Sequence, residues 1–272
     1  MADFVPLKGG DNATTTTTTT ARFFVPSYIR TSVLRAATGS LLFATVVAVV
    51  AALAVDTMDD RFGCGLAAAI NLVATWHYTK MLSIRESSPG PATEMAIEAV
   101  RLSDWFVTLP PLVIEIHMML GWYTKWFTPP TAALLLGAVV SMGAFVRLGT
   151  DELAPPTKAS TNSDAIVRLF GFAMFLGAFA LLAVVLCNAF VDLPDDPMGG
   201  WTWAFAFPWI GYGVVAAIGI VSRNVWAEYS DGLSLFKDFA YSALDIWSKA
   251  AFGLFIASRT LGQNEKLFGF EM

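Results

Sequence analysis

The sequence predicts an all-α membrane protein, a bundle of seven transmembrane helices. Hydrophobic residues make up 56% of its 272 residues and charged residues only 14%, whereas about 25% of a soluble domain is charged. Seven apolar segments, each long enough to cross a bilayer as a helix, alternate with short joints whose Pro, Gly, Asp and Ser are typical of turns. The segments are 28–55, 62–84, 94–124, 129–149, 164–191, 200–223 and 234–260.

Two polar tails flank this single predicted domain, 28–260. Residues 1–27 include a threonine run and are expected to be disordered, and residues 261–272 form a short C-terminal tail. We expect the N-terminus to be extracellular or lumenal, although the basic residues of the joints favour the opposite orientation by the positive-inside rule. Which cellular membrane holds the protein is left open.

Composition also excludes several classes of function. The net charge is -5, and the chain has two cysteines, in separate segments, and two histidines. These numbers argue against nucleic-acid binding, a disulfide scaffold and a multi-histidine metal centre. The sequence contains no phosphate-binding loop and no nucleophile–base motif, so we expect no enzyme activity.

The seventh segment carries Asp245 and Lys249 near its middle. A charge at bilayer depth costs at least ~2.5 kcal/mol, and a spacing of four places both side chains on one helix face. Other lysines, such as Lys237, lie at segment ends, where we expect them to snorkel to water. A desolvated lysine can serve as a Schiff-base nucleophile; the alternative is a structural pair that only holds helices together.

The third segment contains Arg101, Asp104, Thr108 and Glu115. On an ideal helix, Thr108 is rotated by about 40° from Asp104 and Glu115 by about 20°, so the three share a face. The two carboxylates stand roughly 16 Å apart along the axis, the layout of a two-station proton relay. The alternative is an Arg101–Asp104 ion pair with Glu115 at a helix end. In the second segment, His77 is either a packing residue or a partner of Asp104.

The third-segment pattern RxxDWxxTxPxxxxE, together with DxxxK in the seventh, resembles the microbial rhodopsins, and Trp76-His77-Tyr78 narrows the likeness to proteorhodopsin- and xanthorhodopsin-like proton pumps. The resemblance implies that Lys249 binds all-trans retinal as a protonated Schiff base. It implies that Asp104 is the primary counterion and proton acceptor, Asp245 the second counterion, Arg101 the extracellular switching arginine, and Glu115 the cytoplasmic proton donor.

The same resemblance assigns the neighbouring polar and pocket residues. Thr108 matches the hydroxyl that hydrogen-bonds the acceptor, His77 the histidine that pairs with it, and Tyr78 the tyrosine that hydrogen-bonds the second counterion. Trp105 matches a wall of the retinal pocket. Leu112 occupies the colour-tuning position, where leucine implies green rather than blue absorption.

The sixth segment departs from the family's usual Trp-x-x-Tyr-Pro. We align this pattern with Trp203, Phe207 and Pro208, which leaves one extra residue and replaces the tyrosine by phenylalanine. Either the helix contains a one-residue bulge, or Trp203 is not the pocket tryptophan. Because Phe207 has no hydroxyl, we expect Asp245 to lack one of its usual partners.

The leading hypothesis is therefore a light-driven outward proton pump. Its alternatives are a light-gated channel or sensory photoreceptor on the same scaffold, and a retinal-free proton-coupled transporter, although the inverted repeats common in transporters are not evident. We expect lipid and transported protons as partners, and a homo-oligomer of unspecified size. Carotenoid binding is left open, as is the proton-release group, for which Glu94 and Glu98 are candidates.

Overall fold

The structure is a computed structural model that describes residues 27–87, 91–121, 208–215 and 231–263, with single positions at 173, 177, 180, 184, 204 and 218. Its principal elements are α1 (Ser27–Ala54), α2 (Met58–Ser87), α3 (Pro91–Gly121), α8 (Asp231–Asp245), the π-helix η1 (Ile246–Ala251) and α9 (Phe252–Gln263). These bounds lie within four residues of the first, second, third and seventh predicted segments. The fourth segment, most of the fifth and sixth, and nearly all of both tails lie outside the described residues.

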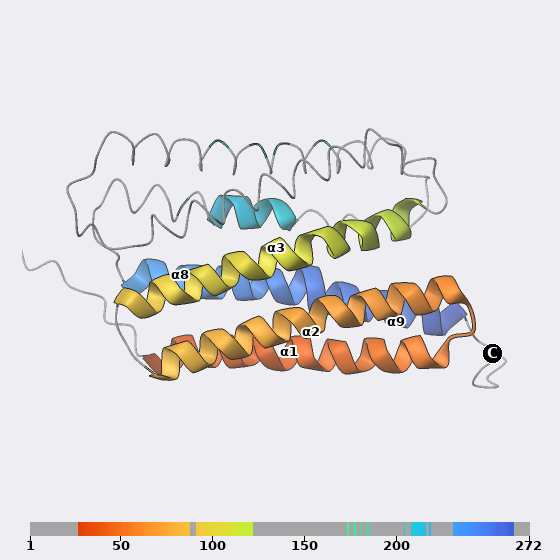
Figure 1. The fold of residues 1–272 in the computed structure, drawn as a ribbon, viewed down its shortest axis with the longest axis horizontal. Helices are drawn as coiled ribbons and strands as arrows, with labels where there is room; N and C mark the ends of the chain where they lie inside the picture. The colour runs from red at the N-terminus through yellow and green to blue at the C-terminus, as the bar shows by residue number, and fades with distance from the viewer. Residues whose placement is uncertain are drawn as a thin grey trace, which may run out of the picture.

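The helices lie side by side as long rods (Figure 1). Helices α1, α2 and α3 run antiparallel in succession, and α8, η1 and α9 follow one another as one continuous rod in the direction of α1 and α3. This rod packs against both α1 and α2. Side chains from α2, α3 and the last rod therefore meet in the interior.

The turn between α1 and α2 shows how local sequence ends one helix and starts the next. The Thr57 hydroxyl accepts a hydrogen bond from the Asp60 backbone N–H at 3.1 Å and donates to the Asp60 carboxylate at 2.6 Å. This is the capping arrangement that satisfies free N–H groups at a helix start. The Arg61 guanidinium donates to the Val55 carbonyl at 2.8 Å, which closes the turn from the other side.

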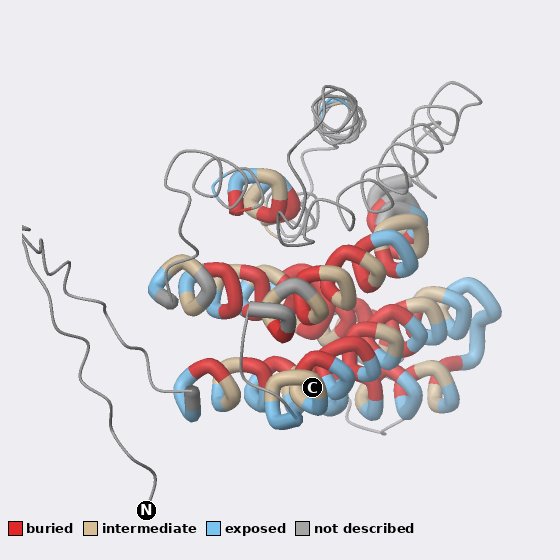
Figure 2. Tube along the Cα trace, turned by 60° about the vertical axis from the view of Figure 1, so that its left-hand side comes forward, coloured by how far each residue is buried: buried red, intermediate tan, exposed pale blue. Residues whose placement is uncertain are grey.

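The polarity of the bundle is inverted relative to that of a water-soluble protein. Leu53, Trp76 and Phe239 are 80%, 61% and 62% exposed, whereas Asp104 and Lys249 are at most 2% exposed. Figure 2 shows this division along the described rods, with buried positions facing the interior and exposed positions facing outward. Large exposed apolar surfaces mark contact with a membrane or partner, and ionisable groups inside a membrane bundle face its interior.

One helix in the described part of the chain is long and apolar enough to cross a membrane by itself, at Tyr28–Ala54. Helices α2 and α3 carry their charged residues inside the bundle and at their ends, which lowers their mean hydropathy. A buried helix of a soluble protein passes the same test. The membrane assignment therefore rests on the family, given below, together with the inverted polarity.

Candidate functional site

Lys249 lies at the centre of the bundle with its amine between two carboxylates. The Nζ atom forms an ion pair with Asp104 of α3 and another, at 2.7 Å, with Asp245 of α8. All three side chains are at most 2% exposed. We call these three residues the central triad. The sequence spacing had predicted the Asp245–Lys249 pair, and the fold adds Asp104 to it.

The backbone at Lys249 is a π-helix rather than an α-helix. The widened segment η1 spans Ile246–Ala251, and the Phe252 N–H donates to the Lys249 carbonyl at its end. Such π turns are rare and occur frequently at functional sites. The widening begins directly after Asp245, so it changes the helical register between the carboxylate and the amine that it pairs with.

His77 and Thr108 both lie beside Asp104, but only His77 reaches its carboxylate. The Nδ1 atom of His77 is 3.2 Å from Asp104 Oδ1 and 2.9 Å from the Val73 carbonyl oxygen. Both neighbours are acceptors, so Nδ1 carries the hydrogen. Thr108 donates instead to the backbone carbonyl of Asp104, at 2.8 Å. The predicted pairing of His77 is confirmed, whereas the hydroxyl contact expected for Thr108 falls on the backbone.

Asp245 accepts two tyrosine hydroxyls. Tyr78 donates to Oδ2 at 2.7 Å, as predicted, and Tyr212 donates to Oδ1 at 2.6 Å. The Tyr212 hydroxyl also lies 2.8 Å from Ser248 Oγ. The expectation that Asp245 lacks a hydroxyl partner from the sixth segment was therefore wrong.

The error came from the alignment of the sixth segment. Trp209 and Tyr212 keep the Trp-x-x-Tyr spacing, with Gly213 at the position where the usual pattern has proline. Both side chains are buried. Anchoring the pattern on Pro208 selected a tryptophan and a phenylalanine further back; Trp203 and Phe207 lie outside the described residues. Pro208 itself is half-buried and precedes the helical stretch.

Buried aromatic and aliphatic side chains lie near the triad. The Trp105 ring meets those of Tyr212 and Tyr241 edge-on, each at a centroid distance of 5.0 Å. Trp105, Leu112, Trp209 and Tyr212 belong to one buried hydrophobic cluster. A long apolar polyene aldehyde fits this donor set, because Lys249 offers a buried amine and the cluster an apolar lining. Trp105 and Leu112 are both buried in this cluster, and their roles at the retinal pocket and in colour tuning stay predictions.

Glu115 lies further along α3 and is 2% exposed. Its Oε1 atom has no hydrogen-bond partner among the described residues. Glu115 is therefore a buried carboxyl group away from any described cation, which argues against a position at an exposed helix end.

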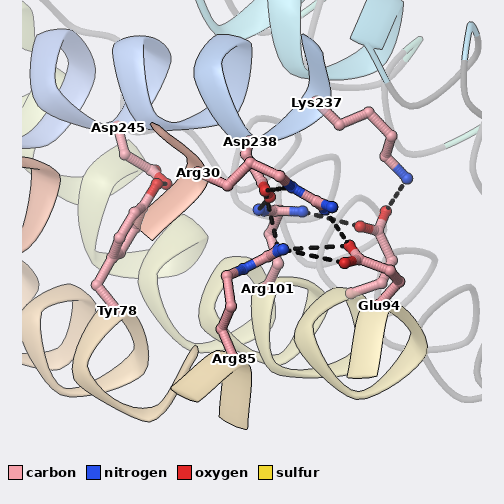
Figure 3. A network of polar contacts seen from close by, with 9 residues as sticks. Arg30, Tyr78, Arg85, Glu94, Arg101, Lys237, Asp238 and Asp245 are labelled. Atoms are coloured by element: carbon pink, nitrogen blue, oxygen red, sulfur yellow. Dashed lines mark hydrogen bonds and ion pairs between the residues drawn. The ribbon is translucent and has the colours of Figure 1, made fainter. Parts of the chain in front are cut away.

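The Arg101 side chain reaches a second set of charges, which includes Asp238 (Figure 3). Its guanidinium donates to Glu98 and to Asp238, both at 2.9 Å, and lies 4.7 Å from the centre of the Tyr241 ring. The alternative of an Arg101–Asp104 pair is therefore not what the structure contains. Asp238, which the sequence had not singled out, takes that place.

Asp238 is the centre of what we call the arginine network. Besides Arg101, it accepts from Arg30 at 3.2 Å and Arg85 at 2.8 Å, so helices α1, α2 and α3 all donate to α8. The network consists of Arg30, Arg85, Glu94, Glu98, Arg101, Lys237 and Asp238. Lys237 is 6% exposed and bonds Glu98 at 2.7 Å, so the expected snorkelling of Lys237 was wrong.

Comparison with known proteins identifies the family. The model of the bacteriorhodopsin-like proteins matches residues 29–263. The chain belongs to this family, whose members are integral, multi-pass membrane proteins, and its fold is the seven-helix membrane bundle. No curated protein matches the sequence.

Several solved structures share the fold. Xanthorhodopsin, described as a light-driven ion pump with dual chromophore, has 16% identity and a TM-score of 0.60, covering 88% of this chain and 95% of its own. A blue light-absorbing proteorhodopsin from Med12 has 16% identity, a TM-score of 0.55 and coverages of 88% and 99%. Bromide-bound halorhodopsin from Halobacterium salinarum has 19% identity, a TM-score of 0.59 and coverages of 88% and 96%. At such identities the likeness establishes the fold alone.

Proposed function

We propose that this protein is a light-driven outward proton pump that carries retinal on Lys249 as a protonated Schiff base. The observation that carries the proposal is the burial of the Lys249 amine between two carboxylates, with a third buried carboxyl group, Glu115, that has no ion pair among the described residues. A pump needs an acceptor beside the nitrogen and a donor on the other side. Asp104 and Glu115 supply both.

The chain's own groups account for each proton position. In the resting state the Lys249 nitrogen holds its proton and is balanced by Asp104 and Asp245. When bound, retinal supplies light absorption and an isomerisation that changes the direction and the proton affinity of this nitrogen. The proton then passes to Asp104, which His77 contacts at 3.2 Å. This transfer neutralises both groups and leaves the net charge of the interior unchanged, while Asp245 keeps its two tyrosine hydroxyls.

Return of a proton to Lys249 uses the opposite side. Burial without a cationic partner favours the neutral form of a carboxyl group, so Glu115 is placed to hold a proton in reserve. Two tyrosine hydroxyls keep Asp245 in place as the fixed counterion throughout. Net outward transport then requires that the nitrogen face Asp104 when it releases its proton and Glu115 when it regains one.

External pH tests the proposal directly. Cells that express the chain with retinal are illuminated in an unbuffered suspension, with and without a protonophore. We expect acidification of the medium that the protonophore abolishes, and none from a Lys249→Ala variant. Alkalinisation would overturn outward pumping. An absence of pH change from a coloured protein would favour the alternative, a sensory photoreceptor or a channel for another ion.

A further inference from the structure

An asparagine of α2 touches the backbone of the retinal-binding lysine. Asn71 is 1% exposed, and its Nδ2 atom donates to the Ala67 carbonyl at 2.9 Å and to the Lys249 carbonyl at 3.2 Å. Because both neighbouring atoms are carbonyl oxygens, the amide atom that faces them is the nitrogen, which donates. The Oδ1 atom therefore faces elsewhere, and it has no hydrogen-bond partner within the described part of the chain.

Gly253 of α9 makes this close approach of the Asn71 amide possible. A Cβ atom added to Gly253 would lie 2.7 Å from Asn71 Nδ2 and 3.5 Å from the Ala67 Cβ. The first of these distances is too short for any two such atoms, so a side chain at this position would displace the Asn71 amide. The contact between α2 and the π turn thus depends on a matched pair, Asn71 and Gly253.

Asn71 also lies between the two ends of the predicted proton path. It is seven residues from Tyr78, which bonds Asp245. On the other side it is eight residues from Gly63, where an added Cβ would lie 3.8 Å from the Met118 side chain, three residues beyond Glu115 on α3. Asn71 therefore lies on α2 between the level of the central triad and that of Glu115.

We propose that Asn71 is a positioning residue for the return of the proton from Glu115 to Lys249, an inference that rests on the proposed pump function. Its amide N–H holds the Lys249 peptide in the widened turn. Its oxygen, a buried acceptor of a kind that proteins seldom leave unused, accepts a hydrogen bond from water carrying the proton. Glu115 loses one proton, each water passes on the proton that it receives, and the Lys249 nitrogen gains one.

The first test replaces the amide without changing its size. Asn71→Leu removes both the donor to Lys249 and the acceptor oxygen, and we expect proton return to the Lys249 nitrogen, followed by flash absorption, to slow by about tenfold or more. Thr75→Val is the matched control, because Thr75 is buried one turn away on the same helix and its hydroxyl bonds the Asn71 backbone carbonyl rather than the Asn71 amide. We expect the control to return its proton within twofold of the unchanged protein.

The second test keeps Asn71 in the sequence but displaces its side-chain amide. Gly253→Ala introduces the clashing Cβ, and we expect the same slowing as for Asn71→Leu. Gly262→Ala on the same helix meets nothing within 4 Å and is the matched control. A small weak acid added to the medium, such as azide, should restore the rate in both slow variants, since it supplies protons without the path. A purely structural defect would not respond to it.

A further measurement separates this inference from the pump proposal. In the retinal-free full-length protein, hydrogen exchange of the amides around Lys249 should be at least tenfold faster in Asn71→Leu and Gly253→Ala than in the two controls. Exchange and proton-return rates within twofold of the unchanged protein in both variants would overturn the inference. If the unchanged protein binds retinal but moves no protons, the pump proposal fails while the exchange result still tests the Asn71–Lys249 contact.

Discussion

The central triad and the arginine network are both buried sets of opposite charges, but they differ in what their charges can do. The triad has one cation and two carboxylates, and the network has four cations and three carboxylates. Three network cations are arginines, which cannot be deprotonated in proteins. The triad cation is a lysine nitrogen, which can give up its proton.

This difference separates a working site from a fixed one. A proton that moves from Lys249 to Asp104 neutralises both partners and leaves the net charge of the triad unchanged. No equivalent transfer is open to the three arginines around Asp238, so Asp238 and these arginines join helices α1, α2, α3 and α8 as a static anchor. Because Arg101 belongs to this anchor, it contributes to the balance of the triad from a distance rather than by contact.

The largest effect is expected from replacing each of the two buried lysines of the last rod, in turn, by arginine. Lys249→Arg preserves the charge but cannot form a Schiff base, so we expect complete loss of visible absorption after retinal is added. Lys237→Arg, in the network, should keep its colour. A coloured Lys249→Arg protein would remove the distinction between the two lysines and with it the assigned retinal site.

Removing the centre of the network should destabilise the fold without removing colour. Asp238→Asn leaves three guanidinium groups without their shared carboxylate, and loss of one partner of a buried pair costs about 3–5 kcal/mol. Thermal or denaturant unfolding measures this change. Glu86→Gln is the control, because the Arg35–Glu86 pair is exposed and such pairs contribute at most about 1 kcal/mol. Equal losses in the two variants would contradict the anchor role of Asp238.

Glu115 extends the comparison to a carboxyl group that has no ion pair in the described structure. Glu115→Gln keeps the shape and removes the transferable proton, and a positioned acid typically contributes about 100-fold or more to a proton-transfer rate. We therefore expect proton return to Lys249 to slow by about 100-fold, with the ground-state spectrum nearly unchanged. An unaltered flash-absorption time course would take the donor role away from Glu115.

The smallest effect is expected at the second counterion. Tyr212→Phe removes one of the two hydroxyls on Asp245, and a hydrogen bond to a charged group contributes about 1.5–3 kcal/mol. The free energy of unfolding should fall by that amount, and Tyr78→Phe should give a loss of similar size because both hydroxyls are buried and short. No loss of stability from Tyr212→Phe would argue against the Tyr212–Asp245 hydrogen bond. It would favour the alignment of the family pattern with Trp203, Phe207 and Pro208.

Sequence reasoning located the rods and the triad because both depend on local signals. The long apolar runs predicted the helix bounds to within four residues. A lysine one turn from an aspartate inside such a run is costly at bilayer depth, so the pair indicated a functional site. The patterns of the third and seventh segments, with Trp76-His77-Tyr78 of the second, predicted through the rhodopsin resemblance that Asp104, His77 and Tyr78 lie near the Asp245–Lys249 pair, where the structure places them.

What the sequence did not reveal depends on contacts between distant segments. Asp238 and Lys237 lie near a segment end, where a charge is ordinarily solvated, and only the packing of four helices shows them to be buried. Tyr212 was a different kind of error, since the Trp-x-x-Tyr spacing was present and the proline misdirected the alignment. Thr108 lies on the predicted face, but its hydroxyl satisfies the preceding turn of its own helix, as threonine often does.

Infrared difference spectroscopy during illumination tests the central claim most directly, namely that the triad transfers a proton while the network stays fixed. As the Lys249 nitrogen loses its proton, we predict a new protonated-carboxyl band that Asp104→Asn abolishes and Glu98→Gln preserves. A band that persists in Asp104→Asn but disappears in Glu98→Gln would contradict the account. It would place the accepting carboxylate in the network instead of the triad.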